Sequence, residues 1–323
     1  MNKVIKVGVA GVGYLGRYHA EKYKAIPGVD LVGVADVEPE RAEAVAANLG
    51  VKPFFDSQEL IGRVDAISVV VPTKYHYEVA RPFLKQGVHV MLEKPITRTL
   101  EEADSLIELA EKNNLVLQVG HLERFNPAFK TVSSMIDTPL FIEASRISSF
   151  PERGTDVDVV LDLMIHDLDI VLNLVGNRPV SVQAVGAPVV TNHVDIANAR
   201  LEFDSGCVAN LTASRISDKT LRKSRIFQKD AYFSIDYGER QVMVARRSAE
   251  GPSGKPETTT QELTVPSGDS LEDELRSFIN SVANRSAPLV SGEDGRRALA
   301  LALQIMTKIN DRLKNWPEIA VEE

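Results

Sequence analysis

The sequence predicts an α/β protein: an N-terminal doubly wound parallel sheet followed by a C-terminal α+β domain with an open, mostly antiparallel sheet. In the first part of the chain, short apolar segments alternate with helical patterns, and a glycine-rich turn follows the first apolar segment. In the later part, polar and apolar residues alternate along the predicted strands. The length of 323 residues suits two domains. We expect them at residues 1–121 and 122–323.

The first domain is predicted from strand and helix segments that alternate along the chain. The strand segments are apolar on both faces, which is typical of a parallel sheet covered by helices. Right-handed crossovers between them make the fold doubly wound. Strands are expected at 4–10, 31–35, 66–71, 88–92 and 115–119, and helices at 14–26, 39–48, 75–86 and 100–113.

The second domain is predicted from a change of pattern after about residue 121. Period-2 alternation such as that of 197–203 indicates an antiparallel sheet with one polar face. The polar segment 248–261, rich in Gly, Pro and Thr, is expected to be a loop. Helices are expected at 127–135, 157–175, 269–285 and 293–314, and strands at 180–190, 196–203, 207–214, 224–228, 232–237 and 242–246.

Composition excludes several classes of protein. Lys and Arg total 37 against 45 Asp and Glu, a net charge of −8, which argues against a nucleic-acid partner. A single cysteine, Cys207, allows no intrachain disulfide. The most apolar stretch, 157–175, carries four aspartates and a histidine, so it is not a membrane span. The N-terminus enters a strand pattern directly, so we expect a cytoplasmic protein without a membrane partner.

A phosphate-binding loop is predicted at Gly11-Val-Gly13-Tyr-Leu-Gly16, between the first strand and the first helix. The first glycine allows the tight turn, the second lets a pyrophosphate approach the backbone, and the third lets helix and strand pack closely. Asp36 ends the second strand twenty residues after Gly16, where a carboxylate binds the adenosine ribose hydroxyls. The alternative is a glycine turn that arose by chance.

Asp36 also predicts NAD rather than NADP as the cofactor. A 2′-phosphate about 4 Å from this carboxylate would be repelled by roughly 4 kcal/mol at an effective dielectric near 20, which is about 1000-fold in affinity. Val37 and Glu38 follow, with no immediate arginine to bind that phosphate.

The segment Glu93-Lys94-Pro95 directly follows the fourth strand. Ligands of such sheets bind beyond the carboxyl ends of the strands, and Pro95 favours an extended conformation for Lys94. A lysine beside a nicotinamide ring can hydrogen-bond the reacting oxygen and stabilise its charge. The alternative is a solvated surface lysine before a turn.

A polar stripe is predicted along the apolar helix 157–175. Its members recur every three or four residues: Asp158, Asp162, His166, Asp169 and Asn173. Because buried polar groups need partners, the stripe indicates a face that lines a site, and Asp162 can orient His166 as a base. Two alternatives remain: an amphipathic helix with its polar side in water, and a zinc site. No second histidine has ligand spacing here, so we expect no metal.

Taken together, these motifs resemble the Gfo/Idh/MocA family, the glucose–fructose oxidoreductase and inositol dehydrogenase group. The resemblance covers essentially the whole chain. It is carried by the glycine motif with His19, by Pro72 and His76, by Glu93-Lys94-Pro95, by Arg124-Phe125, by Asp162-x-x-x-His166 and by Gly292-Glu-Asp-Gly295. It implies a Rossmann domain, an α+β domain, NAD(P)-dependent redox chemistry on a sugar or polyol carbon, and a homodimer or homotetramer.

The resemblance also implies roles for individual residues. Lys94 and His166 become catalytic, with His166 as the base and Lys94 holding the oxygen, although the two roles could be exchanged. Asp162 becomes the supporting residue. The NAD-binding set becomes Gly11, Gly13, Tyr14, Leu15, Gly16, Asp36, Pro72, Thr73, His76, Glu93 and Lys94. This chain lacks the glycine-rich lead into Asp-x-x-x-His that many members have, which limits the transfer of substrate contacts.

Two stretches, 120–127 and 153–166, further resemble the UDP-N-acetylglucosamine 3-dehydrogenase branch of this family. That branch oxidises the sugar 3-hydroxyl to a ketone, which a partner aminotransferase aminates for lipid A. The substrate-binding set then becomes Lys94, Arg124, Asn126, Arg153, Asp162 and His166, with arginines, Arg146 among them, suited to the UDP phosphates. The alternative for each arginine is a surface salt bridge.

Two other functions stay open. One is an NAD-dependent dehydrogenase of a free polyol or sugar, such as an inositol. The other is a catalytically silent dinucleotide-binding regulator. The presence of Lys94, Asp162 and His166 argues against the regulator, because such a protein could lose them freely.

Overall fold

The computed structural model describes residues 4–150, 157–250 and 256–315. The chain forms two compact units, and each contains two separate stretches of sequence. The first consists of Met1–Phe125 and Asp269–Arg296, and the second of Asn126–Gly268 and Arg297–Glu323. Each unit is described by itself.

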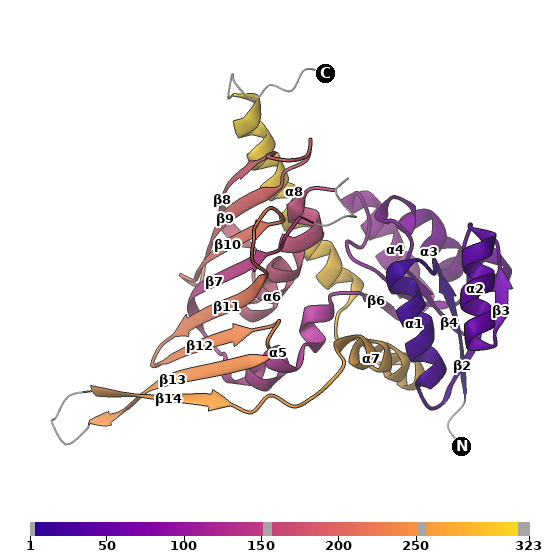
Figure 1. Ribbon diagram of the computed structural model, residues 1–323, viewed down its shortest axis with the longest axis horizontal. Coiled ribbons are helices and arrows are strands. Elements are labelled where there is room, and N and C mark those ends of the chain that lie inside the picture. The colour runs from indigo at the N-terminus through magenta and orange to yellow at the C-terminus, as the bar shows by residue number, and fades with distance from the viewer. Residues whose placement is uncertain (1–3, 151–156, 251–255, 316–323) are drawn as a thin grey trace. The chain divides into compact units, whose positions relative to one another are not determined.

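A six-stranded parallel sheet forms the first unit, in the order β3-β2-β1-β4-β5-β6. Figure 1 labels β2, β3, β4 and β6 of this sheet. This order confirms the predicted doubly wound fold, in which the strand order reverses at β1 and β4. The strands are β1 (Ile5–Ala10), β2 (Val29–Ala35), β3 (Lys52–Phe54), β4 (Ala66–Val69), β5 (His89–Leu92) and β6 (Leu117–Val119). The helices are α1 (Tyr14–Ala25), α2 (Pro39–Leu49), α3 (His76–Lys85), α4 (Leu100–Lys112) and α7 (Ser270–Asn284).

Helix α7 corrects the predicted domain boundary, which assigned all of 122–323 to the second domain. The apolar face of α7 is buried in the same hydrophobic cluster as side chains of β1, β2 and α1, through Leu275, Phe278, Ile279 and Val282. Gln118 of β6 also donates from Nε2 to the carbonyl of Glu274 at 3.0 Å. The sequence predicts the helix from its periodicity, but periodicity does not identify the sheet against which a helix packs.

An eight-stranded sheet forms the second unit, in the order β14-β13-β12-β11-β7-β10-β9-β8 (Figure 1). Strands β7 and β10 run parallel, and the other neighbours run antiparallel. The strands are β7 (Pro139–Ile147), β8 (Pro179–Ala187), β9 (Ile196–Phe203), β10 (Val208–Ser214), β11 (Leu221–Gln228), β12 (Ala231–Asp236), β13 (Gln241–Glu250) and β14 (Pro256–Leu263).

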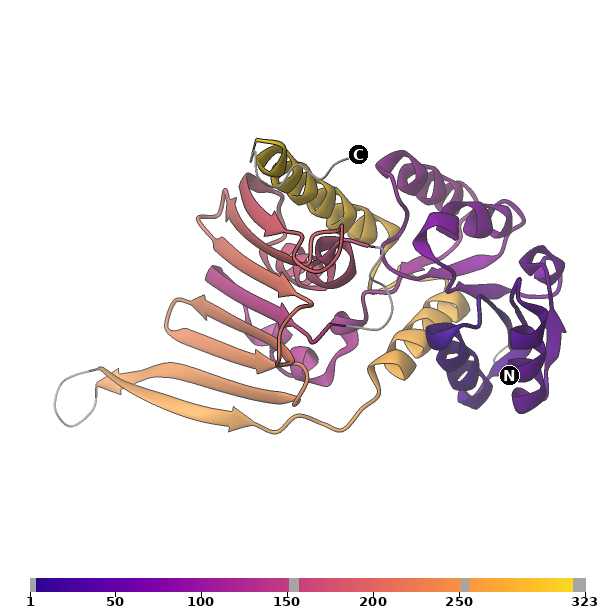
Figure 2. The ribbon, with the colours of Figure 1, turned by 45° about the horizontal axis from the view of Figure 1, so that its top comes forward.

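Three helices pack against one face of this sheet: α5 (Pro127–Val132), α6 (Ile165–Val175) and α8 (Gly292–Lys314), which begins in the first unit (Figure 2). Their apolar side chains form one core with alternate residues of the strands, such as Ala197, Ala199 and Leu201 of β9. The intervening residues Ile196, Asn198 and Arg200 are exposed. This alternation confirms the predicted sheet with one polar face.

Some predicted elements of the second unit differ from the structure. Strand β7 was not predicted. Residues 248–250 and 256–261 of the expected loop 248–261 are strand, because β14 pairs with β13 and sets Thr258 opposite Arg247 and Thr260 opposite Ala245. Residues 251–255 of that loop lie outside the described residues. Threonine is β-branched and favours such extended pairing despite its polarity. None of the helices within the described ranges is long and apolar enough to cross a bilayer.

Candidate active site

The glycine loop between β1 and α1 has the geometry that a dinucleotide needs. Gly11 adopts φ +83°, and a Cβ on Gly16 would lie 1.8 Å from the carbonyl oxygen of Gly11. A Cβ on Gly13, in contrast, would meet no atom within 4 Å. No side chain caps the N-terminus of α1, and its first turn holds no acidic residue. The loop therefore fits a pyrophosphate, which would lie over Gly13 and the free amides.

A cavity of about 1090 Å³ extends from this loop along the carboxyl ends of the first unit's strands. Seven of the predicted NAD-binding residues line it: Gly11, Gly13, Leu15, Asp36, Pro72, Glu93 and Lys94. The other four predicted residues lie in the flanking turns and helices and not on the cavity wall: Tyr14, Gly16, Thr73 and His76. The cavity also has walls that the sequence did not indicate, among them Arg41, Phe55 and Tyr75.

Asp36 is almost buried at one end of this cavity. Its carboxylate accepts hydrogen bonds from the backbone N–H of Val12 (2.9 Å) and of Glu38 (3.0 Å). Arg41 adds an ion pair, with Nη1 3.1 Å from Oδ1. No arginine directly follows Asp36 in the sequence, and Arg41 was not predicted to lie beside it. Arg41 follows five residues later, within α2, so the first turns of this helix bring it back to the end of β2.

Lys94 is half-buried on the cavity wall, and its neighbour Glu93 on the same wall is buried. Glu93 faces His19, with Oε1 3.3 Å from Nε2, and accepts the backbone N–H of Lys94. Burial alone would raise the pKa of Glu93, but His19 and Lys94 outweigh it and hold that pKa below its usual range. A charged, buried carboxylate thus supports the backbone that carries Lys94.

His76 supports the same corner from α3. Its Nδ1 lies 2.8 Å from the carbonyl oxygen of Pro95 and its Nε2 lies 2.9 Å from that of Val71. Burial lowers the pKa of His76, although both carbonyls act to raise it. The imidazole therefore links the end of β4 to the residue after Lys94, which is a structural contact rather than a contact with the cavity.

In the second unit, the segment 157–175 is not the continuous α-helix that was predicted. Val160–Met164 forms a π-helical turn and α6 begins only at Ile165. Such turns interrupt the regular 100° spacing and are common at functional sites. Asp162 lies on the π-turn and His166 on the first turn of α6, and both are half-buried.

The predicted polar stripe is accordingly broken. Asp158 accepts the backbone N–H of Val194 at 2.7 Å ahead of the helix. Asp169 is buried at 1% exposure, whereas Asn173 is exposed. Asp162 and His166 are half-buried on the helical part of the segment, as expected of groups that meet a substrate. Asp158 is half-buried as well, but its carboxylate binds the backbone of Val194.

The residues predicted to bind the substrate or its phosphates have structural contacts where the structure describes them. Arg124 is buried in the first unit, with Nη2 3.7 Å from Oδ1 of Asp294. Asn126 caps α5 by accepting the backbone N–H of Ala128 at 3.0 Å. Arg146 forms a buried two-pronged ion pair with Asp167. Arg153 lies outside the described residues. Contact between these side chains and a UDP group stays a prediction.

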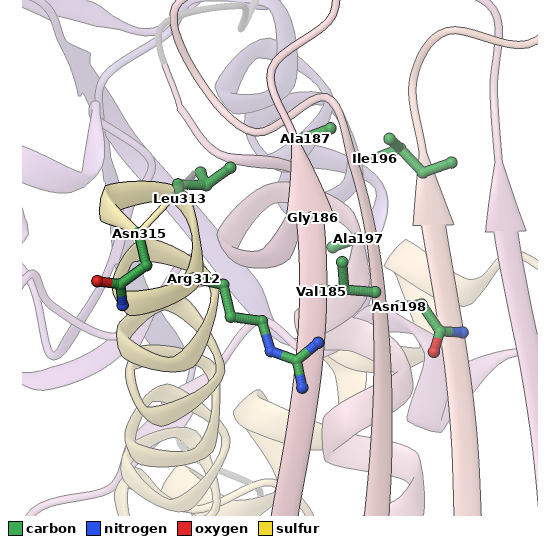
Figure 3. A pocket seen from close by; sticks show the side chains of 9 residues that line it. All are labelled: Val185, Gly186, Ala187, Ile196, Ala197, Asn198, Arg312, Leu313 and Asn315. Atoms are coloured by element: carbon green, nitrogen blue, oxygen red, sulfur yellow. The ribbon is translucent and has the colours of Figure 1, made fainter. Parts of the chain in front are cut away.

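A second cavity lies between the end of α8 and strands β8 and β9 (Figure 3). It measures about 580 Å³, and its walls are mainly apolar, including Val185, Ile196 and Leu313. Among the described residues that line it, Arg312 is the one ionisable side chain, so these residues offer no acid–base pair. Across the described ranges, no group of three or more His, Cys, Asp and Glu side chains could hold a metal ion.

Comparison with known proteins identifies the family. Residues 5–121 match the model of the oxidoreductase family with an NAD-binding Rossmann fold, GFO_IDH_MocA. Residues 141–231 match the GFO/IDH/MocA C-terminal domain. Both matches agree with the fold and with the glycine-loop cavity.

Two individual relatives are similar over nearly the whole chain. A UDP-N-acetylglucosamine 3-dehydrogenase of Acidithiobacillus ferrooxidans is 41% identical over 94% of this chain and 97% of its own length. A solved structure of that enzyme matches with a TM-score of 0.90 and 40% identity, over 95% of this chain and 98% of the other. A myo-inositol 2-dehydrogenase of Thermotoga maritima is 29% identical over 95% of this chain and 97% of its own length. The chain therefore belongs to the Gfo/Idh/MocA family and is an NAD-dependent dehydrogenase.

Proposed function

We propose that the protein oxidises the 3-hydroxyl of UDP-N-acetylglucosamine to the 3-keto sugar with NAD. One observation carries the proposal: the 41% identity, over 94% of the chain, to an enzyme named for this reaction. The identity to a myo-inositol 2-dehydrogenase is lower, at 29%, although the coverage is similar. A free polyol is therefore the second candidate substrate.

The cofactor would be held by the first unit. Gly13 leaves the pyrophosphate room, Asp36 accepts the ribose hydroxyls, and Lys94 lies on the wall of the same cavity. Bound NAD⁺ supplies the acceptor for the hydride that leaves C3. Every other chemical task falls to side chains of this protein.

Those tasks are assigned to three residues. His166 takes the proton of the 3-hydroxyl as its oxygen becomes a ketone. Lys94 donates a hydrogen bond to the same oxygen and stabilises its growing negative charge. Asp162 orients and supports the imidazole of His166. The partial exposure of all three side chains supports these roles, because each is accessible to a ligand.

The phosphates of the substrate would be bound by arginine, and Arg153 remains the candidate for this task. Arg124 and Asn126 are retained in the proposal as neighbours of the substrate, although both have structural contacts of their own. The product is a ketone, which an aminotransferase could convert to an amine for lipid A synthesis. We propose that such an enzyme is the downstream partner.

The test is a panel of UDP-sugars and free polyols, including UDP-N-acetylglucosamine and myo-inositol, with NADH absorbance as the readout. Each substrate is measured with and without an aminotransferase and its amino donor, because removal of the ketone draws the oxidation forward. NADH formation that requires the UDP-linked N-acetyl sugar supports the proposal. Faster NADH formation from a free polyol would favour the second candidate instead.

A further inference from the structure

The segment that carries Asp162 and His166 is held by two buried arginines. Arg146 is the penultimate residue of β7, and Arg215 directly follows the last residue of β10. Strands β7 and β10 form the parallel pair of the second sheet, with Arg146 opposite Ala213. The carboxyl ends of parallel strands lie at the same end of the sheet, so both arginines lie at that end.

Arg215 holds the beginning of this segment. Its Nη1 donates to the carbonyl of Val157, three residues before the π-turn. Its Nε bonds Asp195 at 2.8 Å and its Nη2 bonds Thr191 at 3.1 Å. One guanidinium thus joins the segment to the loop between β8 and β9.

Asp195 fixes that loop in turn. One carboxylate oxygen accepts the backbone N–H groups of Val189, Val190 and Thr191 at 2.7–2.9 Å. The same loop contacts the segment a second time, since Asp158 accepts the N–H of Val194 and the N–H of Val159 bonds the Val194 carbonyl. The beginning of the segment is therefore held at three consecutive residues, 157, 158 and 159.

Arg146 holds the other end. Its Nε and Nη2 bond the two oxygens of Asp167 at 3.0 and 2.9 Å, and both side chains are 5% exposed. Asp167 directly follows His166 in α6. The orientation of the first turn of α6 is thus fixed one residue from the imidazole.

Stability alone does not require a buried ion pair, because well-packed apolar side chains of similar volume often stabilise the folded state equally well. Their forked geometry, however, fixes a partner's position in a way that packing does not. We infer that Arg146 and Arg215 are positioning residues that hold Asp162 and His166 in place for proton transfer. This inference rests on the role proposed for His166. It gives Arg146 a role through its ion pair with Asp167, in place of the phosphate contact considered from the sequence.

The test uses Arg146→Lys and Arg215→Lys, which keep the positive charge but replace the fork with a single ammonium. Because Asp167 and Asp195 stay neutralised, we expect folded protein with a thermal midpoint close to that of the wild type. The KM for NAD should also stay unchanged, while kcat falls about 10- to 100-fold, the size of loss that a small misplacement gives. Hydrogen exchange in residues 157–170 should become faster. The matched control is Arg225→Lys, whose arginine pairs with Glu143 on the exposed side of the same sheet and should leave kcat unchanged.

Two results would overturn the inference. One is exchange in residues 157–170 that stays at the wild-type level in both lysine variants, whatever their activities. The other is faster exchange with an unchanged kcat, because the arginines would then hold the segment without serving catalysis. His166→Asn, assayed in parallel, tests the proposed function separately. Full turnover in His166→Asn would remove His166 from the mechanism. Loss of turnover in His166→Asn together with full activity in both lysine variants would overturn the positioning role alone.

Discussion

Arg41 places its Nη1 3.1 and 3.3 Å from the two carboxylate oxygens of Asp36. Asp36 is the residue expected to repel the 2′-phosphate of NADP. A cation beside it weakens that repulsion, so the preference for NAD should be smaller than the isolated carboxylate predicts. The side chain of Arg41 is 49% exposed, so solvent screens its effect.

Arg41→Ala should therefore increase the preference for NAD over NADP. We expect the ratio of kcat/KM values to rise about 2- to 5-fold, as an ion pair worth about 0.5–1 kcal/mol gives. Asp36→Ala should lower the ratio, because Arg41 then faces the 2′-phosphate unopposed. Steady-state kinetics with both cofactors measures this, with Arg63→Ala, outside the cavity, as the control. An unchanged ratio in Arg41→Ala would show that Arg41 has no part in cofactor selection.

The glycine loop allows cofactor binding to be separated from folding. A methyl group at residue 13 meets no protein atom, so Gly13→Ala should fold with an unchanged thermal midpoint. The same group stands where the pyrophosphate must approach, so the KM for NAD should rise at least ~10-fold. Gly16→Ala is the matched variant, and it should lower the thermal midpoint because its Cβ meets the Gly11 carbonyl. Unchanged NAD binding in Gly13→Ala would place the cofactor elsewhere.

His166→Asn should abolish most turnover while leaving NAD binding intact. A positioned general base contributes about 10²–10⁴ in rate, and kcat should fall by that factor. Asp162→Asn should cause a smaller loss, since it only supports the imidazole. Asn173→Ala, at the exposed end of the same helix, is the control and should keep wild-type kcat. Stopped-flow NAD titration and kcat are measured on each variant, and a fully active Asn variant at 166 would exclude the residue as the base.

Acid should destabilise the second unit through Asp195. Burial would raise the pKa of this carboxyl, but three backbone N–H groups and Arg215 outweigh it and hold the pKa well below its usual range. The unfolded chain therefore takes up this proton first, at about pH 4. The stabilisation is complete above that pH and is lost as the pH falls toward the lower pKa of the folded state.

Urea unfolding between pH 5 and pH 2 tests this contribution of Asp195. The free energy of unfolding should fall less steeply with decreasing pH in Asp195→Asn than in the wild type, because the variant has no carboxylate to protonate at this position. Parallel slopes for the two proteins would contradict the prediction.

The first unit was predictable because its rules are local. Apolar strands, a glycine turn and Asp36 all lie in the order that a nucleotide-binding sheet requires, and the structure brings Gly13, Asp36 and Lys94 to one cavity. Arg41 was missed because only the geometry of α2 returns it to Asp36. Helix α7 was assigned to the wrong unit because its periodicity shows an apolar face but not the sheet against which that face packs.

The second unit was less predictable because its contacts are non-local. Asp195 and Arg215 read as ordinary polar residues in the sequence, yet side-chain exposures of 0% and 1% make them a buried pair. An aspartate just before a strand and an arginine just after one give no signal in the sequence of the partners that they bind. The π-turn at 160–164 was equally hidden, because the segment keeps an almost continuous helical pattern.

The most direct test of the central claim follows one hydrogen atom. The enzyme is incubated with NAD⁺ and UDP-N-acetylglucosamine deuterated at C3, and the NADH formed is analysed by mass spectrometry. Oxidation of the 3-hydroxyl predicts that the NADH carries one deuterium and that the sugar nucleotide loses it as a 3-ketone. Unlabelled NADH, or none at all while a free polyol is oxidised readily, would contradict the account.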